Sequence, residues 1–288
     1  MPVAATPGRL FRTRLRWRKL AAVLGVVLGG LVFWDYGDEF LLPTQKELAL
    51  EDRIGCQIFL GWSDGAGERD RKVVQFDFIH RKARENWDLF DEQFAHLNGV
   101  MVDDFEGDFV AALLPIPFLY RFLVNSRFGE DAHEDELVHE LAHLHYATLP
   151  DRTTFRAAWE TISGSRYHGC QTYADGACAD REPCEYFVRR TAAVGCYAAH
   201  SFDEDVAETV RMIYDLNRYP PRNPRETELP PIHVYRELIP RIIDKIYLAS
   251  EFGFASCNQA YHATRLLEEY LMSYTVPFRV GPSVPAND

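Results

Sequence analysis

Basic residues are few in this chain compared with acidic ones. Its 288 residues include 31 lysines and arginines against 43 aspartates and glutamates, which gives a formal net charge of −12 at pH 7. The basic residues gather at the start: residues 1–36 hold six of them and one acidic residue, a net charge of +5, so the rest of the chain carries −17. Because such a surface repels phosphate groups, nucleic-acid binding is not expected.

Long hydrophobic runs are lacking too. The uncharged run from Leu20 to Trp34 has 15 residues, fewer than the roughly 20 that span a membrane without tilt. It follows a basic segment, the order found in signal peptides and signal anchors, and no Ala-x-Ala cleavage site or lipoprotein cysteine comes after it. We therefore expect residues 1–36 to be an uncleaved signal anchor that contacts the membrane through residues 20–34. The remaining chain would lie outside the cytoplasm, or would be secreted if the segment were cleaved.

No two cysteines form a Cys-x-x-Cys pair, the spacing typical of structural zinc sites. The six cysteines are Cys56, Cys170, Cys178, Cys184, Cys196 and Cys257. An even number in a chain that leaves the cytoplasm favours disulfide bonds. A second zinc site among the four cysteines between residues 170 and 196 is the alternative, and the sequence does not tell which cysteines would pair.

The pentapeptide His139-Glu140-Leu141-Ala142-His143 lies in a segment, residues 134–147, that has the apolar periodicity of a helix. In a helix, side chains four positions apart share a face, so both imidazoles can bind one metal ion. Glu140 follows the first histidine and can act as general base on water held by the metal. The motif supplies half of a catalytic zinc site, which needs a third protein ligand.

The residues directly after the motif do not supply that ligand. Tyr146 and Leu149 occupy the positions at which metzincins carry a glycine and a third histidine, which excludes that subclass. Glu160 lies at a distance familiar from thermolysin-type enzymes and is one candidate. However, Gly164, four residues later, offers no acid to support a ligating histidine.

A better candidate lies further along the chain. Glu204 is followed one helical turn later by Glu208, which can accept a hydrogen bond from a ligating imidazole and fix its tautomer. Tyr197 stands seven residues before Glu204, and Glu204 opens a Glu-x-x-Ala-Glu segment. Together with the His-Glu-x-x-His motif, this combination resembles the anthrax lethal factor-like zinc metallopeptidases and the bacterial zinc peptidases that share their catalytic core. The resemblance covers residues 134–214.

This resemblance implies a complete active site with one zinc ion per chain and a peptide or protein as substrate. The implied roles are zinc ligand for His139, His143 and Glu204, general base for Glu140, and oxyanion donor for Tyr197. The chain departs from the family at Asp205 or Val206, where an aromatic residue is usual, and in the cysteine-rich stretch between the two motifs.

We expect residues 37–280 to form one helix-rich α+β domain of the zincin-like metallopeptidase type with a small N-terminal β-sheet, followed by a disordered tail at 281–288. Apolar content of 47% allows a full core. Strands are predicted at 54–62, 72–80 and 107–114, and helices at 81–97, 134–147, 234–248 and 258–274. A proline-rich loop is predicted from Tyr219 to Pro231.

The predicted function is zinc-dependent hydrolysis of peptide bonds outside the cytoplasm. Three alternatives stay open. The chain could be a degenerate zincin that keeps the metal and only binds, an amidase that acts on a non-peptide amide, or a structural envelope protein in which the motif arose by chance.

Overall fold

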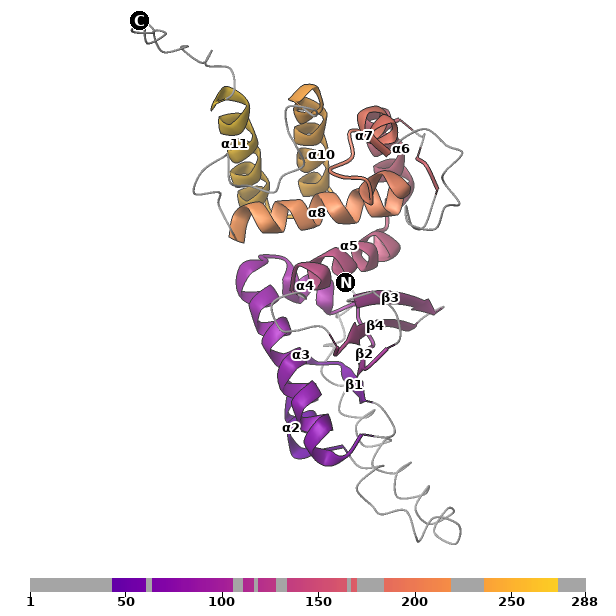
Figure 1. Ribbon diagram of the computed structural model, residues 1–288, viewed down its shortest axis with the longest axis vertical. Helices are drawn as coiled ribbons and strands as arrows, with labels where there is room; N and C mark the ends of the chain where they lie inside the picture. Colours follow the sequence, from indigo (N-terminus) through magenta and orange to yellow (C-terminus); the bar gives the residue numbers. More distant parts are fainter. Residues whose placement is uncertain are drawn as a thin grey trace, which may run out of the picture. The chain divides into compact units, whose positions relative to one another are not determined.

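The computed structural model describes residues 43–60, 64–105, 111–116, 119–127, 134–164, 167–169, 184–218 and 236–273 (Figure 1). The predicted signal anchor, the stretch 170–183, the proline-rich loop and the C-terminal tail lie outside these residues. Within them, no helix is both long and apolar enough to span a membrane. The chain divides into two compact units: residues up to Arg81 together with Leu97–His133 form the first, and Lys82–His96 together with the residues from Glu134 form the second.

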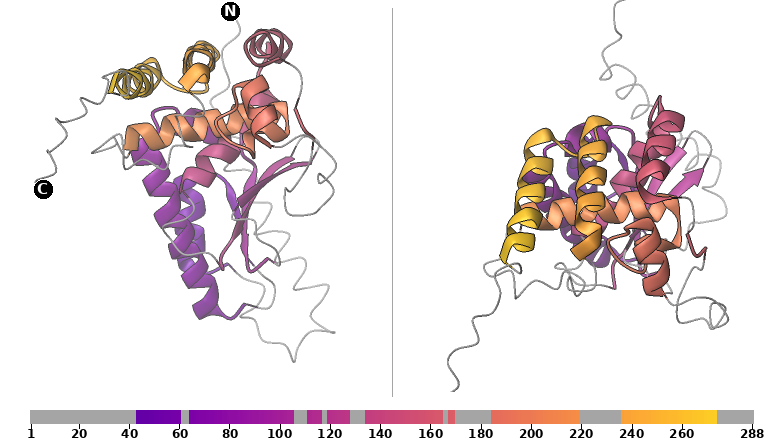
Figure 2. Two further views of the ribbon diagram at one scale, coloured as in Figure 1. Left: turned by 45° about the horizontal axis from the view of Figure 1, so that its top comes forward. Right: turned by 90° about the horizontal axis from the view of Figure 1, so that it is seen from above.

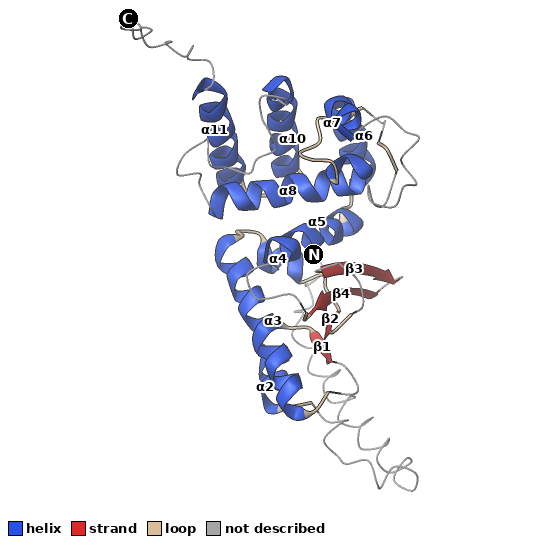
Figure 3. Ribbon diagram, viewed as in Figure 1, coloured by secondary structure: helices blue, strands red, loops and turns tan. Residues whose placement is uncertain are grey.

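The first unit contains a four-stranded mixed sheet, which confirms the predicted helix-rich α+β class (Figure 3). Its elements are α2 (Gln45–Ile54), β1 (Gln57–Leu60), α3 (Ala66–Asn86, whose end belongs to the second unit), β2 (Gly99–Asp103), β3 (Ala111–Ile116) and β4 (Leu119–Asn125). In the strand order β1-β2-β4-β3, the first three strands are parallel and β3 pairs antiparallel with β4. Strand β3 extends beyond the strand predicted at 107–114 and continues through Pro115, because an edge strand tolerates proline.

The start of the first unit shows how local sequence sets helix ends. Thr44 and Glu47 form a capping box, in which each side chain accepts from the other residue's backbone N–H at 3.2 Å. Gly55 ends α2 with a φ of +77°, a conformation that glycine adopts readily. The carboxylate of Glu51 then accepts the backbone N–H of Ile58 at 2.9 Å, which ties α2 to β1.

The predicted strand at 72–80 is wrong, because these residues lie within α3. Buried positions in this part of the helix are Val73, Phe76, Ile79 and Ala83, a spacing of three or four that belongs to a helix. A short run of apolar and β-branched residues matches strand and helix templates equally well. The charged residues that precede this run favour a helix, and they indicated the structure better than the run itself.

In its described residues the second unit is helical. Its elements are α4 (Phe90–Phe94), α5 (Glu134–Thr148), α6 (Arg152–Ser163), α7 (Cys184–Thr191), the 3₁₀ helix η4 (Ala198–His200), α8 (Phe202–Arg218), the 3₁₀ helix η5 (Arg236–Leu238), α10 (Ile239–Glu251) and α11 (Cys257–Ser273). Helix α5 packs on one side of α8, and α10 and α11 lie next to each other on the other side (Figure 2). The apolar face of α8 is fully buried at Ala207, Val210, Ile213 and Tyr214. Helix α8 is therefore the central element of this unit.

The cysteines divide into bonded and free ones. Cys196 is in a disulfide bond, whose partner is not among the described side chains. Cys56 and Cys257 are free thiols, so the disulfide bonding that the even number of cysteines favoured does not extend to these two. Burial raises the pKa of the Cys56 thiol to about 12, so this cysteine stays a neutral apolar side chain of the core rather than a reactive thiol.

Candidate metal centre

The two histidines of the motif project from one face of α5. This helix buries Leu137, Val138 and Leu141 almost completely, so the core of the second unit fixes its register. The register places Nε2 of His139 and Nε2 of His143 3.1 Å apart. Two nitrogens this close can share a proton or bind the same cation.

Glu204 reaches the histidines from the first turn of α8. The sequence Ser201-Phe-Asp-Glu204 matches a capping box, in which the glutamate would turn back to the backbone of the serine. Ser201 does cap the helix, since its Oγ accepts the backbone N–H of Glu204 at 3.2 Å. The carboxylate of Glu204 points elsewhere: its Oε2 lies 3.2 Å from Nε2 of His139 and 3.6 Å from Nε2 of His143.

These three atoms form a triangle that fits one metal ion. Zinc bonds to nitrogen and carboxylate oxygen are about 2.0–2.2 Å long, so two ligands at tetrahedral corners lie about 3.3–3.6 Å apart. The observed sides of 3.1, 3.2 and 3.6 Å come close to that length. Oε2 of Glu204 is buried and accepts no well-aligned hydrogen bond from the described residues. Two imidazoles and a carboxylate are also a ligand set typical of catalytic zinc.

The electrostatics of the cluster favour a positive charge between its members. Burial alone would lower the pKa of His139, but the carboxylates of Glu204 and Glu208 raise it to about 10. Burial opposes ionisation of Glu204, yet the two histidines hold the pKa of its carboxyl far below the usual range. A site that binds a proton this firmly offers the same negative potential to a metal cation.

The carboxylate of Glu208 orients His139 through the ring nitrogen that does not face the metal centre. Nδ1 of His139 lies 2.9 Å from Oε1 of Glu208, a hydrogen-bonding distance although the angle is not that of a well-aligned bond. A donor proton on Nδ1 leaves Nε2 free to bind a metal. Arg211 in turn contacts Glu208 at 3.4 Å, Glu136 at 2.6 Å and Asp135 at 2.5 Å.

Arg211 was not predicted from the sequence. Its separation of three residues from Glu208 was visible there, but its contacts with the acidic first turn of α5 depend on how α5 and α8 pack. The arginine holds the supporting carboxylate in place and offsets part of the negative charge around the histidines.

The predicted catalytic residues lie beside the cluster. Glu140 follows His139 on α5 and is nearly buried. Tyr197 precedes η4, and its ring centroid lies 6.1 Å from that of His139. Burial, together with the carboxylates of Glu204 and Glu140, raises the pKa of the Tyr197 phenol, so its hydroxyl keeps a proton to donate at neutral pH. About half of this side chain is exposed, which leaves it accessible to a ligand.

Other candidates from the sequence fall outside the cluster. Glu160, the alternative third ligand, pairs with Arg156 at 2.8 Å on the surface of α6. His145, two residues after His143, points elsewhere: its Nε2 lies 2.9 Å from the carbonyl oxygen of Phe252. Among the residues that the structure describes, His139, His143 and Glu204 form the one group of three potential metal ligands.

No family model matches the chain, and no relative is found among curated proteins. The fold is similar to that of a solved structure from Bacteroides caccae described as a "putative zinc-binding metallo-peptidase", with 13% sequence identity, a TM-score of 0.45, and coverage of 80% of this chain and 94% of that one. Membership of the lethal factor-like family stays a prediction.

Proposed function

We propose that the chain is a zinc-dependent metallopeptidase. The observation that carries the proposal is the triangle of ligand atoms of His139, His143 and Glu204, with Glu140 directly after the first ligand on the same helix. A ligand set of this kind leaves a fourth coordination position open for chemistry. The presence of the general base argues against a site that only stores metal.

The roles of the side chains follow from their positions. When bound, the ion would supply Lewis-acid activation of water and of the scissile carbonyl. Glu140 would accept a proton on its carboxylate. Tyr197 would donate a hydrogen bond from its phenol to the oxygen that becomes negatively charged. Glu208 would keep the proton of His139 on Nδ1.

The same proposal includes a location. The basic, then uncharged N-terminal sequence favours an anchor through residues 20–34. The disulfide bond of Cys196 supports an oxidising compartment, because disulfides form outside the cytoplasm in most organisms. The proposed enzyme would therefore act on peptides or proteins in the periplasm or outside the cell.

Metal analysis of purified full-length chain tests the metal centre, with two glutamates as a matched pair. The parent is expected to hold one zinc ion per chain. Glu204→Gln should lose zinc, whereas Glu160→Gln, an identical change on the surface of α6, should keep it. Zinc release by Glu160→Gln alone would show that the third ligand is on the nearer helix.

A peptide library incubated with the zinc-loaded chain tests the activity. Cleavage that disappears in Glu140→Gln supports the proposal. Bound zinc without cleavage of any peptide would instead favour a binding protein built on the same fold, and release of ammonia or amine from non-peptide amides would favour an amidase.

A further inference from the structure

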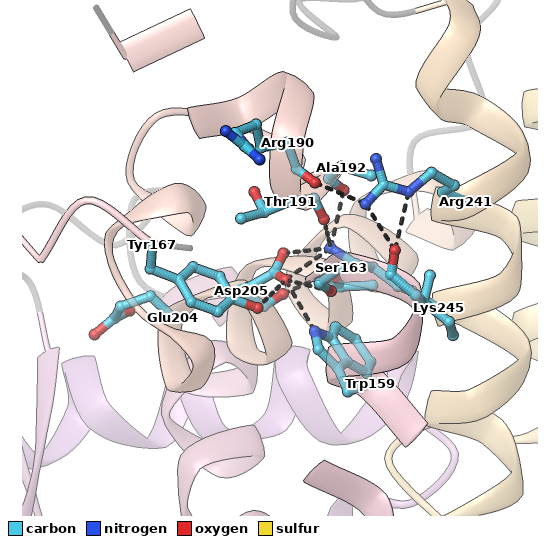
Figure 4. Close-up of polar contacts among 12 residues, drawn as sticks. Trp159, Ser163, Tyr167, Arg190, Thr191, Ala192, Glu204, Asp205, Arg241 and Lys245 are labelled. Carbon is cyan, nitrogen blue, oxygen red and sulfur yellow. Dashed lines mark hydrogen bonds and ion pairs between the residues drawn. The ribbon is translucent and has the colours of Figure 1, made fainter. Parts of the chain in front are cut away.

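A fully buried carboxylate lies next to the proposed third zinc ligand. Asp205 follows Glu204 on α8 and has no exposed surface. Its Oδ2 accepts hydrogen bonds from the indole Nε1 of Trp159 at 2.9 Å, the phenol of Tyr167 at 2.9 Å and the hydroxyl of Ser163 at 3.3 Å (Figure 4). These partners come from α6 and the segment that follows it, so Asp205 joins α8 to both.

A buried lysine completes this network from α10. Nζ of Lys245 lies 2.8 and 2.7 Å from the two carboxylate oxygens of Asp205. It also donates to the carbonyl oxygens of Thr191 at 2.8 Å and Ala192 at 2.9 Å. Lys245 is as fully buried as Asp205, so four protein oxygens surround its ammonium group.

The two carbonyls belong to the end of α7, where the chain turns towards the metal centre. Ala192 has a φ of +49°, a left-handed conformation that is unfavourable for residues other than glycine. The chain passes from this turn to Cys196, Tyr197 and then Ser201, which caps α8. Lys245 thus holds one end of the segment that carries Tyr197, and Asp205 lies just beyond its other end.

Neighbouring positions on a helix point about 100° apart. Asp205 faces Lys245 while Glu204 points away from the network, as Figure 4 shows. Because one peptide bond joins the two residues, a fixed Asp205 also fixes the backbone from which Glu204 reaches the histidines. Metal ligands and catalytic groups must be held within about half an ångström of their working geometry.

We propose that the Asp205–Lys245 pair is a positioning device for the metal centre, which holds Glu204 and the Tyr197 segment in place from α10. This inference rests on the proposed function, since it concerns the same site. A buried ion pair is often no more stabilising than apolar residues of the same size. Its ability to orient two segments at once is therefore the more specific explanation of its presence.

Lys245→Met tests the inference, with Arg241→Met as the matched control. Arg241 lies one turn earlier on α10 and donates to the carbonyls of Ile162 at 2.7 Å and Arg190 at 2.7 Å, so it also docks α10 on α6 and α7. Figure 4 draws no hydrogen bond or ion pair between Arg241 and Asp205. Both substitutions remove a cation from the same helix, but only the first removes the partner of Asp205.

The zinc dissociation constant of full-length folded chain is the first readout. Lys245→Met should weaken zinc binding by about 10- to 100-fold, the usual weight of a residue that supports a ligand, whereas Arg241→Met should change it by less than about threefold. The visible absorption of the cobalt-substituted protein should shift in Lys245→Met alone, because it reports ligand geometry. Equal zinc affinity and an unchanged cobalt spectrum in folded Lys245→Met would overturn the inference.

If Lys245→Met does not fold, the inference can be tested in the parent protein by NMR of two indole N–H protons. Trp159 donates to Asp205, and Trp87, which is equally buried, donates to Gln93 Oε1 at 3.1 Å in the same unit. Removing zinc with a chelator should shift the Trp159 indole resonance and speed its exchange with solvent, with Trp87 unaffected. No change at Trp159, or equal changes at both indoles, would overturn the inference.

The two proposals fail in different ways. A parent chain that binds no zinc would refute the proposed function. A parent that binds zinc, together with a Lys245→Met variant that binds it equally well, would leave the metal centre intact and refute only the positioning role.

Discussion

Among the described residues each unit buries one lysine, and the two lysines differ in their surroundings. Nζ of Lys72 in the first unit lies 2.7 Å from Asp64 and 2.8 Å from Asp103. The side chain of Asp103 is 34% exposed, so water still solvates part of that ion pair. Lys245 in the second unit is paired with Asp205, and neither side chain is exposed at all.

The difference shows what a buried charge is used for. Lys72 joins α3 to the end of β2, where a partly solvated pair costs little and serves the scaffold. The sealed pair of Lys245 costs much more to desolvate. It lies one residue from a proposed zinc ligand, where orientation matters more than stability. The comparison predicts that changes in the second unit affect the chemistry and that changes at Lys72 affect only folding.

The largest effect is expected at the general base. Glu140→Gln should lower the turnover of any peptide substrate by about 100- to 10,000-fold, the usual contribution of general-base catalysis, while zinc stays bound. Turnover and metal content of parent, Glu140→Gln and Lys72→Met measure this. An equal loss of turnover in Lys72→Met would end the assignment of separate roles to the two units.

The next effect concerns the stability of the two lysine sites. Lys245→Met leaves Asp205 without a cation and should lower the free energy of unfolding by about 3–5 kcal/mol. Lys72→Met should cost about 1–3 kcal/mol, because water can solvate the aspartates that remain. Urea denaturation of both variants, followed separately by near-UV and far-UV circular dichroism, gives the two values. A larger cost at Lys72 would reverse the comparison.

Zinc removal should change the rate of amide hydrogen exchange in the second unit and not in the first. At free zinc about 1,000 times its dissociation constant, the ion stabilises the state that binds it by about 4 kcal/mol. Chelation should therefore speed amide exchange in α5 and α8 and leave β2 and β4 unchanged. Faster exchange in the sheet as well would mean that the two units unfold together.

Local sequence was sufficient for the parts of the site that lie within one helix. The spacing of His139 and His143, and that of Glu204 and Glu208, follows from helical periodicity, and the helix predicted at 134–147 agrees with α5 to within one residue. The choice of Glu204 over Glu160 also followed from a pair one turn apart. Features of the site that depend on the periodicity of a single helix could therefore be predicted from the sequence.

Contacts between segments far apart in the sequence could not be predicted. Asp205 and Lys245 are 40 positions apart, and a lone aspartate or lysine on a helix is normally a solvated residue. The strand predicted within α3 failed for a related reason: residues 73–79, apolar except for Gln75 and Asp77, fit both a strand and a helix, and only packing decides between them. Free Cys56 likewise became evident only from its place in the core.

The smallest effect, and the finest test of the comparison, is the pH dependence of the Lys72 site. Burial would lower the pKa of Lys72, but Asp103 and Asp64 outweigh it and raise the pKa above the ordinary value of 10.5. A base whose pKa is raised on folding contributes stability below its unfolded pKa and loses it as pH rises through the folded pKa. The difference in free energy of unfolding between parent and Lys72→Met should therefore stay constant from about pH 7 to about pH 10 and shrink at higher pH. Titrating groups common to both proteins cancel in this difference. An increase in the difference in free energy of unfolding above about pH 10 would therefore contradict a stabilising pair at Lys72.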